Sequence, residues 1–279
     1  MEQSKLKQLK DWFGGYVRDY AMDDPMHQRN LDLKVDHTRR VCQAILDVGK
    51  SLDLSPAELR LAEAIALLHD VGRFEQYHVY QTYVDSKSED HAKLGIRVLE
   101  KHNILTEIDE SESSIIRCSI LYHNRLMIPE IQDKPCLFYS RLIRDADKLD
   151  VYKVVTDYYQ VAHKEYNETI QLDLPDRPEI TESVVKDIRD KQVVHKDYLR
   201  TLNDFKLLQM GWIYDMHFKR SFEIVRERRY LDLILQSMPD HPDIQELGLQ
   251  LQNDLEQFCA RPPDIPLSYL KAAECTSND

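Results

Sequence analysis

At 279 residues, the chain is long enough for one large domain or two smaller ones with a sizeable hydrophobic core. Glycine is scarce, with 7 residues, while Leu, Ala, Glu, Lys, Gln and Arg fill the sequence, which argues against a sheet with many tight turns and predicts an all-α protein. The formal net charge of −12 argues against a protein that coats nucleic acid, and it means that an anionic substrate needs a local positive site, such as a metal.

The cysteines and the apolar segments indicate the compartment. The chain has 5 cysteines, an odd number, and none of them forms a Cys-x-x-Cys pair, which predicts reduced thiols rather than a disulfide framework. The N-terminal segment lacks a continuous apolar stretch, and no window approaches the ~18 apolar residues that cross a membrane. We therefore expect a soluble, cytoplasmic protein with no membrane partner.

Apolar residues recur with helical spacing along the first part of the chain, and short polar breaks separate the resulting segments. Gly14 and Gly15 weaken the middle of the first helix, because glycine is a poor helix former. A polar loop is expected over residues 76–87, after which Ser88 can cap the next helix. The predicted helices cover residues 3–22, 31–54, 56–70, 89–102, 111–123 and 135–159.

The third of these helices has the clearest boundaries. Ser55 and Glu58 form a capping box, and Pro56 occupies the first helical position. The helix is expected to run to about Asp70, where Gly72 allows it to stop. It therefore ends on an adjacent His-Asp pair, and burying such a pair without partners would cost several kcal/mol.

The second part of the chain reads as a helical extension. Residues 171–183 carry two prolines and no apolar period, which is typical of a linker. We therefore expect one domain over residues 1–170 and a C-terminal helical extension over residues 171–279 that packs on the first domain. The predicted helices of the extension cover residues 182–200, 203–219, 220–237 and 241–259.

Polar side chains occur on the apolar faces of five of the early helices. His37, for example, precedes Val41 by four positions and Ile45 by eight, so the three share one helix face. A single inward histidine is most often a core residue bonded to a carbonyl. Four imidazoles and two carboxylates together supply lone pairs and no cation, a set that a divalent metal satisfies. The six inward residues are His37, His69, Asp70, His91, His123 and Asp147.

Three short motifs occur in an informative order: DHTRRV, then HDVGR, then RDADKLD. This order resembles the HD superfamily of metal-dependent phosphohydrolases over about residues 20–165. The resemblance implies the metal ligands His37, His69, Asp70 and Asp147. Because the family places its last ligand immediately before Lys or Arg, it selects Asp147 over Asp145 and Asp150. Helical spacing alone does not separate Asp147 from Asp145.

Two further segments, EDHAKLG and ILYHNR, resemble additions found in superfamily branches that hold two metals. They would add His91 and His123 to the ligands, with Asp70 as the bridge. In branches with one metal, the corresponding residues instead contact substrate or transfer protons. The branch that cleaves cyclic dinucleotides carries a Gly-Tyr-Pro motif, which the segment YHNRLMIPEIQDKP lacks, so that branch is not expected.

The resemblance implies a phosphohydrolase that cleaves a small phosphate ester or a nucleotide with a metal-activated water. Its cofactors would be one or two divalent transition metals, with Mn, Fe, Co, Ni and Zn all suited to imidazole and carboxylate ligands. The expected catalytic residues are Asp70, Arg73, His91 and His123. Arg73 is expected to bind phosphate, because a guanidinium matches phosphate geometry; its alternative role is that of a surface arginine at a helix end.

Two other functions stay open at this point. Some superfamily members with the same ligands bind two irons and oxidise their substrates, so the chain could be a di-iron oxygenase. It could also be a non-catalytic module that senses nucleotides. The sequence leaves open the substrate, the metal and its number, and whether the C-terminal helices cap the site or form a homo-oligomer.

Overall fold

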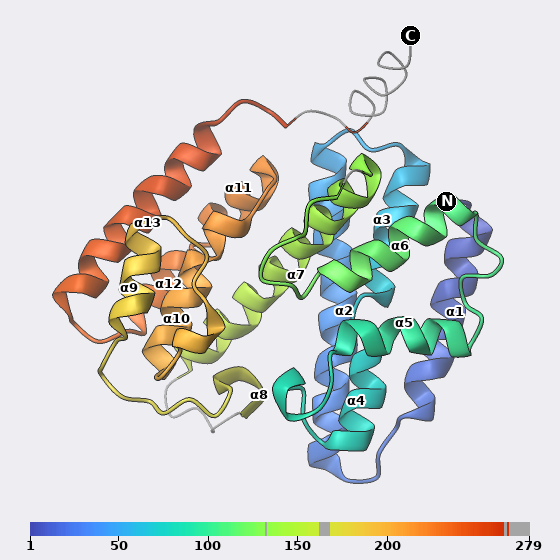
Figure 1. Ribbon diagram of the computed structural model, residues 1–279, viewed down its shortest axis with the longest axis horizontal. Helices are drawn as coiled ribbons and strands as arrows, with labels where there is room; N and C mark the ends of the chain where they lie inside the picture. Colours follow the sequence, from blue (N-terminus) through green and yellow to red (C-terminus); the bar gives the residue numbers. More distant parts are fainter. Residues whose placement is uncertain (132, 162–167, 265–266, 268–279) are drawn as a thin grey trace. The chain divides into compact units, whose positions relative to one another are not determined.

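The computed structural model describes residues 1–131, 133–161, 168–264 and 267. These residues form helices and connecting loops without any strand, which confirms the predicted all-α fold class (Figure 1). The chain divides into two compact units, residues 1–147 and 148–263. The division falls inside a long helix, and the expected domain boundary at residue 170 stays a prediction.

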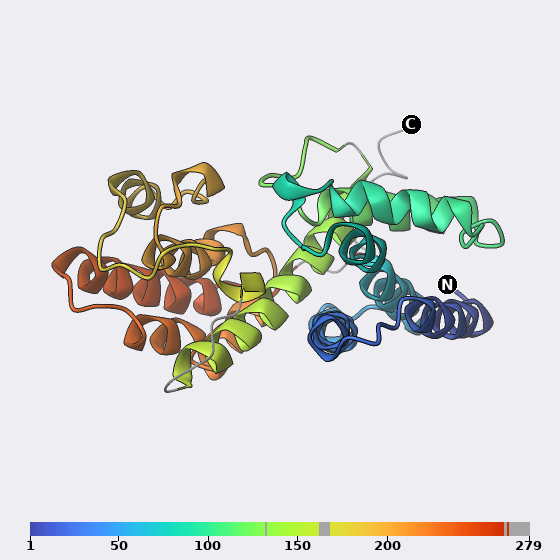
Figure 2. The same cartoon turned by 90° about the horizontal axis from the view of Figure 1, so that it is seen from below.

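The first unit is arranged around α3, which packs against α1, α2 and α6, while α4 packs against α5 (Figure 1, Figure 2). Because α3 has neighbours on several sides, nearly all of its residues from 61 to 68 are buried. The elements are α1 (Gln3–Asp19), α2 (Pro25–Ser51), α3 (Pro56–Leu68), α4 (Gly72–Tyr80), the 3-10 turn η1 (Asp85–Lys87), α5 (His91–Lys101), α6 (Glu110–Tyr122) and the beginning of α7 (Lys134–Gln160).

The start of α3 follows the sequence signals, but its end does not depend on Gly72. The Ser55 side chain accepts from the Glu58 backbone and the Glu58 side chain accepts from the Ser55 backbone, so the capping box is present. Gly72 instead begins α4, where a Cβ atom would overlap the backbone of His91 and Gly95. The absence of a side chain lets α4 and α5 approach closely. This approach brings the start of α5 next to the end of α3.

Two predicted boundaries near α4 and α5 were wrong. The segment expected as a loop from residue 76 continues α4 as far as Tyr80. The cap of α5 is Asp90, whose side chain accepts from two backbone N–H groups of the first turn, and not Ser88. Ser88 accepts a hydrogen bond from Gln76 Nε2 at 2.8 Å instead, because the long-range contact with α4 competes with the local cap.

The second unit has more and shorter helices than the sequence predicts. Its helix α13 packs against α9, α11 and α12. Arg229 has a left-handed backbone, with φ of 56°, and separates α11 from α12 where one helix was expected. The elements after α7 are α8 (Glu168–Gln171), α9 (Glu182–Arg189), η2 (Lys196–Tyr198), α10 (Leu202–Gly211), η3 (Trp212–Asp215), α11 (Lys219–Glu227), α12 (Tyr230–Gln236) and α13 (Pro242–Ala260).

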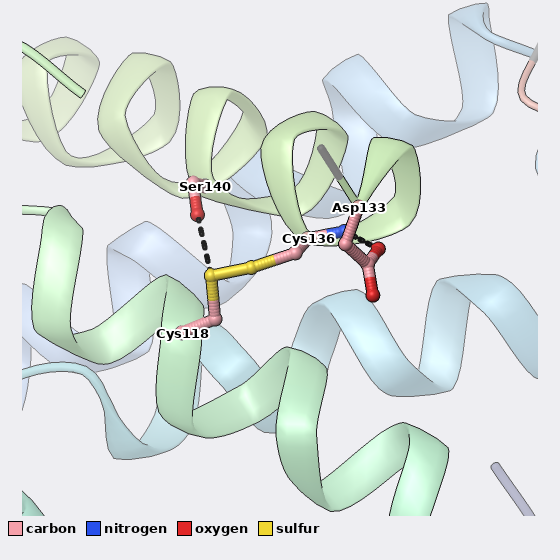
Figure 3. The surroundings of a disulfide bond; sticks show 4 residues. All are labelled: Cys118, Asp133, Cys136 and Ser140. Carbon is pink, nitrogen blue, oxygen red and sulfur yellow. Dashed lines mark hydrogen bonds between the residues drawn. A yellow bond between two sulfur atoms is a disulfide. The ribbon is translucent and has the colours of Figure 1, made fainter. Parts of the chain in front are cut away.

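Cys118 of α6 and Cys136 of α7 form a disulfide, with Cα atoms 6.1 Å apart (Figure 3). The prediction of reduced thiols was therefore wrong for this pair. A separation of 18 residues is not a recognisable pairing signal, and the packing of two helices brings the side chains together. Cys42 and Cys259 are free thiols, and Cys275 lies outside the described residues.

No helix in the described ranges combines the length and the apolar character needed to span a bilayer.

Candidate metal centre

The six residues that the sequence places on inward faces meet in one cluster of the first unit. Groups of three among them have possible ligand atoms within 4.8 Å of one another. The four imidazoles and one carboxylate are buried, whereas the Asp147 side chain is 26% exposed. The cluster comprises His37 in α2, His69 and Asp70 just after α3, His91 at the start of α5, His123 just after α6, and Asp147 in α7.

Asp70 lies in the centre of this cluster, and its two carboxylate oxygens face different partners. Oδ2 lies 3.5 Å from His37 Nε2 and 3.8 Å from His69 Nε2. Oδ1 lies 3.4 Å from His91 Nε2 and 3.7 Å from His123 Nε2. One carboxylate thus separates two pairs of imidazole nitrogens.

Asp147 belongs to the first of these pairs. Its Oδ1 lies 3.2 Å from His37 Nε2 and 4.0 Å from His69 Nε2. Asp145 and Asp150 are also buried, but neither belongs to a group of possible metal ligands among the described residues. The geometry therefore distinguishes Asp147 from Asp145 and Asp150 as a possible metal ligand, which helical spacing alone did not do.

The end of α3 fixes the ring of His69. Its Nδ1 lies 2.7 Å from the carbonyl oxygen of Ala66, in the last turn, where helix carbonyls lack intrahelical donors. Since a carbonyl can only accept, Nδ1 carries the proton. The other ring nitrogen, Nε2, is buried without a hydrogen-bond partner in the part of the chain that the structure describes. A buried lone pair of this kind is available to a metal.

His91 and His123 also have a fixed Nδ1 atom and an Nε2 atom that faces the cluster. Their Nε2 atoms lie 3.0 Å apart. The Nδ1 atom of His91 lies 2.7 Å from Asp85 Oδ2, and that of His123 lies 2.7 Å from the carbonyl oxygen of Ile120. Both partners only accept, so in the neutral rings both Nδ1 atoms are protonated and both Nε2 atoms carry lone pairs. Lone pairs that face each other repel, and a shared cation removes this repulsion.

The surroundings keep His69 and His91 neutral and Asp70 charged. Burial lowers the pKa of His69 to about 4, and burial together with Arg73 lowers the pKa of His91 to about 3. Burial alone would raise the pKa of Asp70, but the positive charges of Lys34 and Arg73 hold it well below its usual range. Neutral imidazole and ionised carboxylate are the forms that bind metals.

The donor set therefore fits a divalent transition metal. Imidazole and carboxylate ligands suit Mn, Fe, Co, Ni and Zn, and no cysteine belongs to the described groups of possible ligands. The Nε2 lone pairs of His69, His91 and His123 also suit a bound cation.

Comparison with protein families identifies the domain that contains this cluster. Residues 35–152 match the family model of the HD domain, and this segment includes the whole cluster. The chain contains an HD domain. The HD superfamily consists mostly of metal-dependent hydrolases. No curated protein and no solved structure matched the chain.

Asp85 is a residue of the HD domain that the sequence analysis missed. Its carboxylate contacts His91 Nδ1 through both oxygens, at 2.9 and 2.7 Å, and it accepts from Gln76 Nε2 at 2.9 Å. Burial alone would raise the pKa of Asp85, but hydrogen bonding to His91 and the charge of Arg73 lower it far below its usual range. A carboxylate in this position can orient a histidine for metal binding. No local pattern reveals it, because it lies in the short 3-10 turn η1, which has no apolar face of its own.

Arg73 is placed beside the cluster but is engaged in holding this loop. Its Nη1 donates to Asp85 Oδ1 at 2.9 Å, to Gln76 Oε1 at 2.8 Å and to the carbonyl oxygen of Tyr83 at 2.5 Å. Its Nε lies 3.5 Å from Asp70 Oδ1. Arg73 thus links the loop after α4 to the central carboxylate, and its contact with phosphate stays a prediction.

Lys34 is a second residue that the sequence analysis missed. It precedes His37 by three positions, so the two share one face of α2, and this spacing could have revealed it. Its Nζ donates to Asp70 Oδ2 at 3.0 Å and lies 5.3 Å from the centre of the Tyr83 ring. The cluster therefore has a second cation at its edge.

Arg144 holds the end of α6. Its Nη1 donates to the carbonyl oxygens of Tyr122 at 3.1 Å and His123 at 3.2 Å. A cation at a helix C-terminus satisfies carbonyls that have no intrahelical donor. Because His123 follows this helix directly, Arg144 contributes to the position of its ring.

Proposed function

We propose that the chain is a metal-dependent phosphohydrolase that cleaves a small phosphate ester or a nucleotide with a metal-activated water. The observation that supports this function best is the position of Asp70, whose two oxygens face two separate pairs of imidazoles. Such an arrangement suits two metals with one bridging carboxylate. The predominance of metal-dependent hydrolases among HD-domain proteins supports the same reaction class.

The two proposed metal sites have different ligand sets. The first consists of His37, His69 and Asp147 together with Asp70 Oδ2. The second would be held by His91 and His123 together with Asp70 Oδ1. A site with three protein ligands leaves positions open, as hydrolysis requires.

A divalent metal bound in this cluster lowers the pKa of a coordinated water toward neutrality and neutralises charge on a phosphoryl group. The chain's own residues supply the other functions. Asp85 and the carbonyl of Ile120 hold the rings of His91 and His123 with Nε2 toward the cluster. Lys34 and Arg73 lie against Asp70, where their charges favour a bound phosphate.

The test is phosphate release by the purified, metal-loaded protein from p-nitrophenyl phosphate and from nucleoside mono-, di- and triphosphates. We expect release from at least one substrate, and we expect a chelator to abolish it. Asp70→Asn should lose bound metal and activity together, because both proposed sites use this carboxylate. Asp157→Asn, at an exposed position of α7, is the matched control and should retain both.

Two outcomes would contradict the proposed phosphohydrolase function. Oxygen consumption by the iron-loaded protein, with oxidised substrate and no phosphate release, would identify a di-iron oxygenase. A stable nucleotide complex that never turns over, with both metals bound, would identify a sensing module.

A further inference from the structure

A cavity of about 480 Å³ lies between α1, α2 and α3. No residue of the metal cluster lines it. Its volume is within the range of small-molecule pockets, ~300–1,000 Å³. This cavity is therefore large enough for a ligand of its own, separate from the metal centre.

The walls of the cavity are mainly apolar. Phe13 and Val17 contribute from α1, and Val35 and Leu46 contribute from α2. Leu67, which is 8% exposed, contributes from α3. Apolar side chains on three helices favour a ligand with an apolar body, because its transfer from water is favourable.

One wall residue has an unmet hydrogen-bonding requirement. Thr38 lines the cavity and is 1% exposed. Its Oγ1 is buried without a hydrogen-bond partner among the described residues. A buried hydroxyl left in this state costs about 1–3 kcal/mol, so a ligand oxygen that accepts its hydrogen would offset a real penalty.

Among the described charged residues of the cavity, only Arg39 offers donors to a negative group on the ligand. Lys10 is neutralised by Glu63, with Nζ and Oε1 2.5 Å apart. Arg39 donates through Nη1 to Asp36 Oδ1 at 2.6 Å, but its guanidinium has five N–H donors in all. The remaining donors of an exposed arginine can bind a carboxylate.

Gly14 keeps part of the α1 wall open. Its backbone does not require glycine, since no glycine in the described residues has a positive φ. Packing does not require it either, because a Cβ atom would meet only Arg18 Nη1, at 3.7 Å. Glycine inside a helix nonetheless costs ~0.5–1 kcal/mol relative to alanine. A side chain at position 14 would project toward the cavity, which Gly14 lines, whereas neighbouring Gly15 does not line it.

From these observations we propose that the cavity between α1, α2 and α3 binds a small amphipathic carboxylic acid. Its aliphatic or aromatic body packs among Phe13, Val35 and Leu67, and its carboxylate accepts hydrogen bonds from Thr38 and Arg39. This site is independent of the phosphohydrolase reaction, and its test uses binding alone.

The test is fluorescence titration of the full chain with 1-anilinonaphthalene-8-sulfonate, an aromatic anion, followed by displacement with octanoate or with octanol. We expect saturable binding of the dye and displacement by octanoate at lower concentration than by octanol. Gly14→Leu should weaken both dye and octanoate by about tenfold or more, because the new side chain occupies the cavity. Gly15→Leu, the same change one position away, is the matched control and should bind like the unmodified protein.

Arg39→Gln tests the carboxylate separately and should remove the preference for octanoate over octanol. Both leucine variants replace glycine in a helix by a better helix former, so loss of folding is not expected, and circular dichroism checks this. Equal dye affinity in the Gly14 and Gly15 variants would place the dye elsewhere and overturn the proposal. Displacement by octanol alone would overturn the choice of a carboxylic acid.

Discussion

The Nε2 atoms of His91 and His123 lie 3.0 Å apart, although the residues are 32 positions apart in the sequence. Each ring directs its Nδ1 proton to an oxygen acceptor, so the two Nε2 lone pairs face each other. Without a cation this arrangement is repulsive. The start of α5 holds His91 and the end of α6 holds His123. These two helix ends therefore position the two histidines of the proposed second metal site.

The first prediction concerns the number of metals. The purified protein should contain two metal ions per chain, and His91→Ala or His123→Ala should reduce this to about one, because each removes a ligand of the second site only. Metal analysis by mass spectrometry gives the stoichiometry, and His195→Ala, at an exposed position, is the control. A single ion in the unmodified protein, unchanged by both variants, would instead assign the two histidines to substrate contacts.

The second prediction concerns Asp85. Asp85→Asn keeps the size of the side chain but removes the charge that orients His91, so affinity for the second metal should fall about 10–100-fold while the first metal stays bound. Competition with a metal-binding dye measures the two affinities. Asp109→Asn changes a carboxylate at the start of α6 and should leave both affinities unchanged. If Asp85→Asn behaves in the same way, Asp85 has no part in metal binding.

The third prediction concerns pH and the metal-free protein. The pKa of His69 is lowered to about 4 and that of His91 to about 3, both below the unfolded value of ~6.5. At pH values between the folded and the unfolded pKa, the unfolded chain binds more protons than the folded chain. The stability conferred by the neutral rings is therefore present above about pH 6.5 and is lost as the pH falls toward 4. Each histidine adds a slope of up to ~1.4 kcal/mol per pH unit.

Urea unfolding of the chelator-treated protein at several pH values measures this slope. His91→Asn should reduce it, while His195→Asn, an exposed control, should not. Parallel slopes for all three proteins between about pH 6.5 and 5 would show that His91 is not buried in its neutral form.

The fourth prediction concerns the disulfide between α6 and α7. It closes a loop of 18 residues, so reduction should lower the free energy of unfolding by about 3 kcal/mol. Chemical denaturation with and without a reductant measures this, and peptide mapping identifies the bond. Cys136→Ser should show no further effect of the reductant, and Cys259→Ser should respond like the unmodified protein. A free thiol at Cys118 under oxidising conditions would contradict the bond.

The sequence by itself determined the fold class and the inward-facing residues. Helical spacing placed His37 on the same face as Val41, and the capping box set the start of α3, because both depend on contacts within a few residues. The order of the HD motifs indicated the family and selected Asp147.

Only the tertiary structure decided how these residues meet. The division of Asp70 between two imidazole pairs depends on α2, α5 and α6, and no local pattern describes their packing. Asp85 reaches His91 from the short turn η1, and Cys118 of α6 reaches Cys136 of α7, through contacts that only tertiary packing creates. Local propensity sets which face of a helix is polar, whereas the partner of each polar group is set by whichever distant segment the core brings beside it.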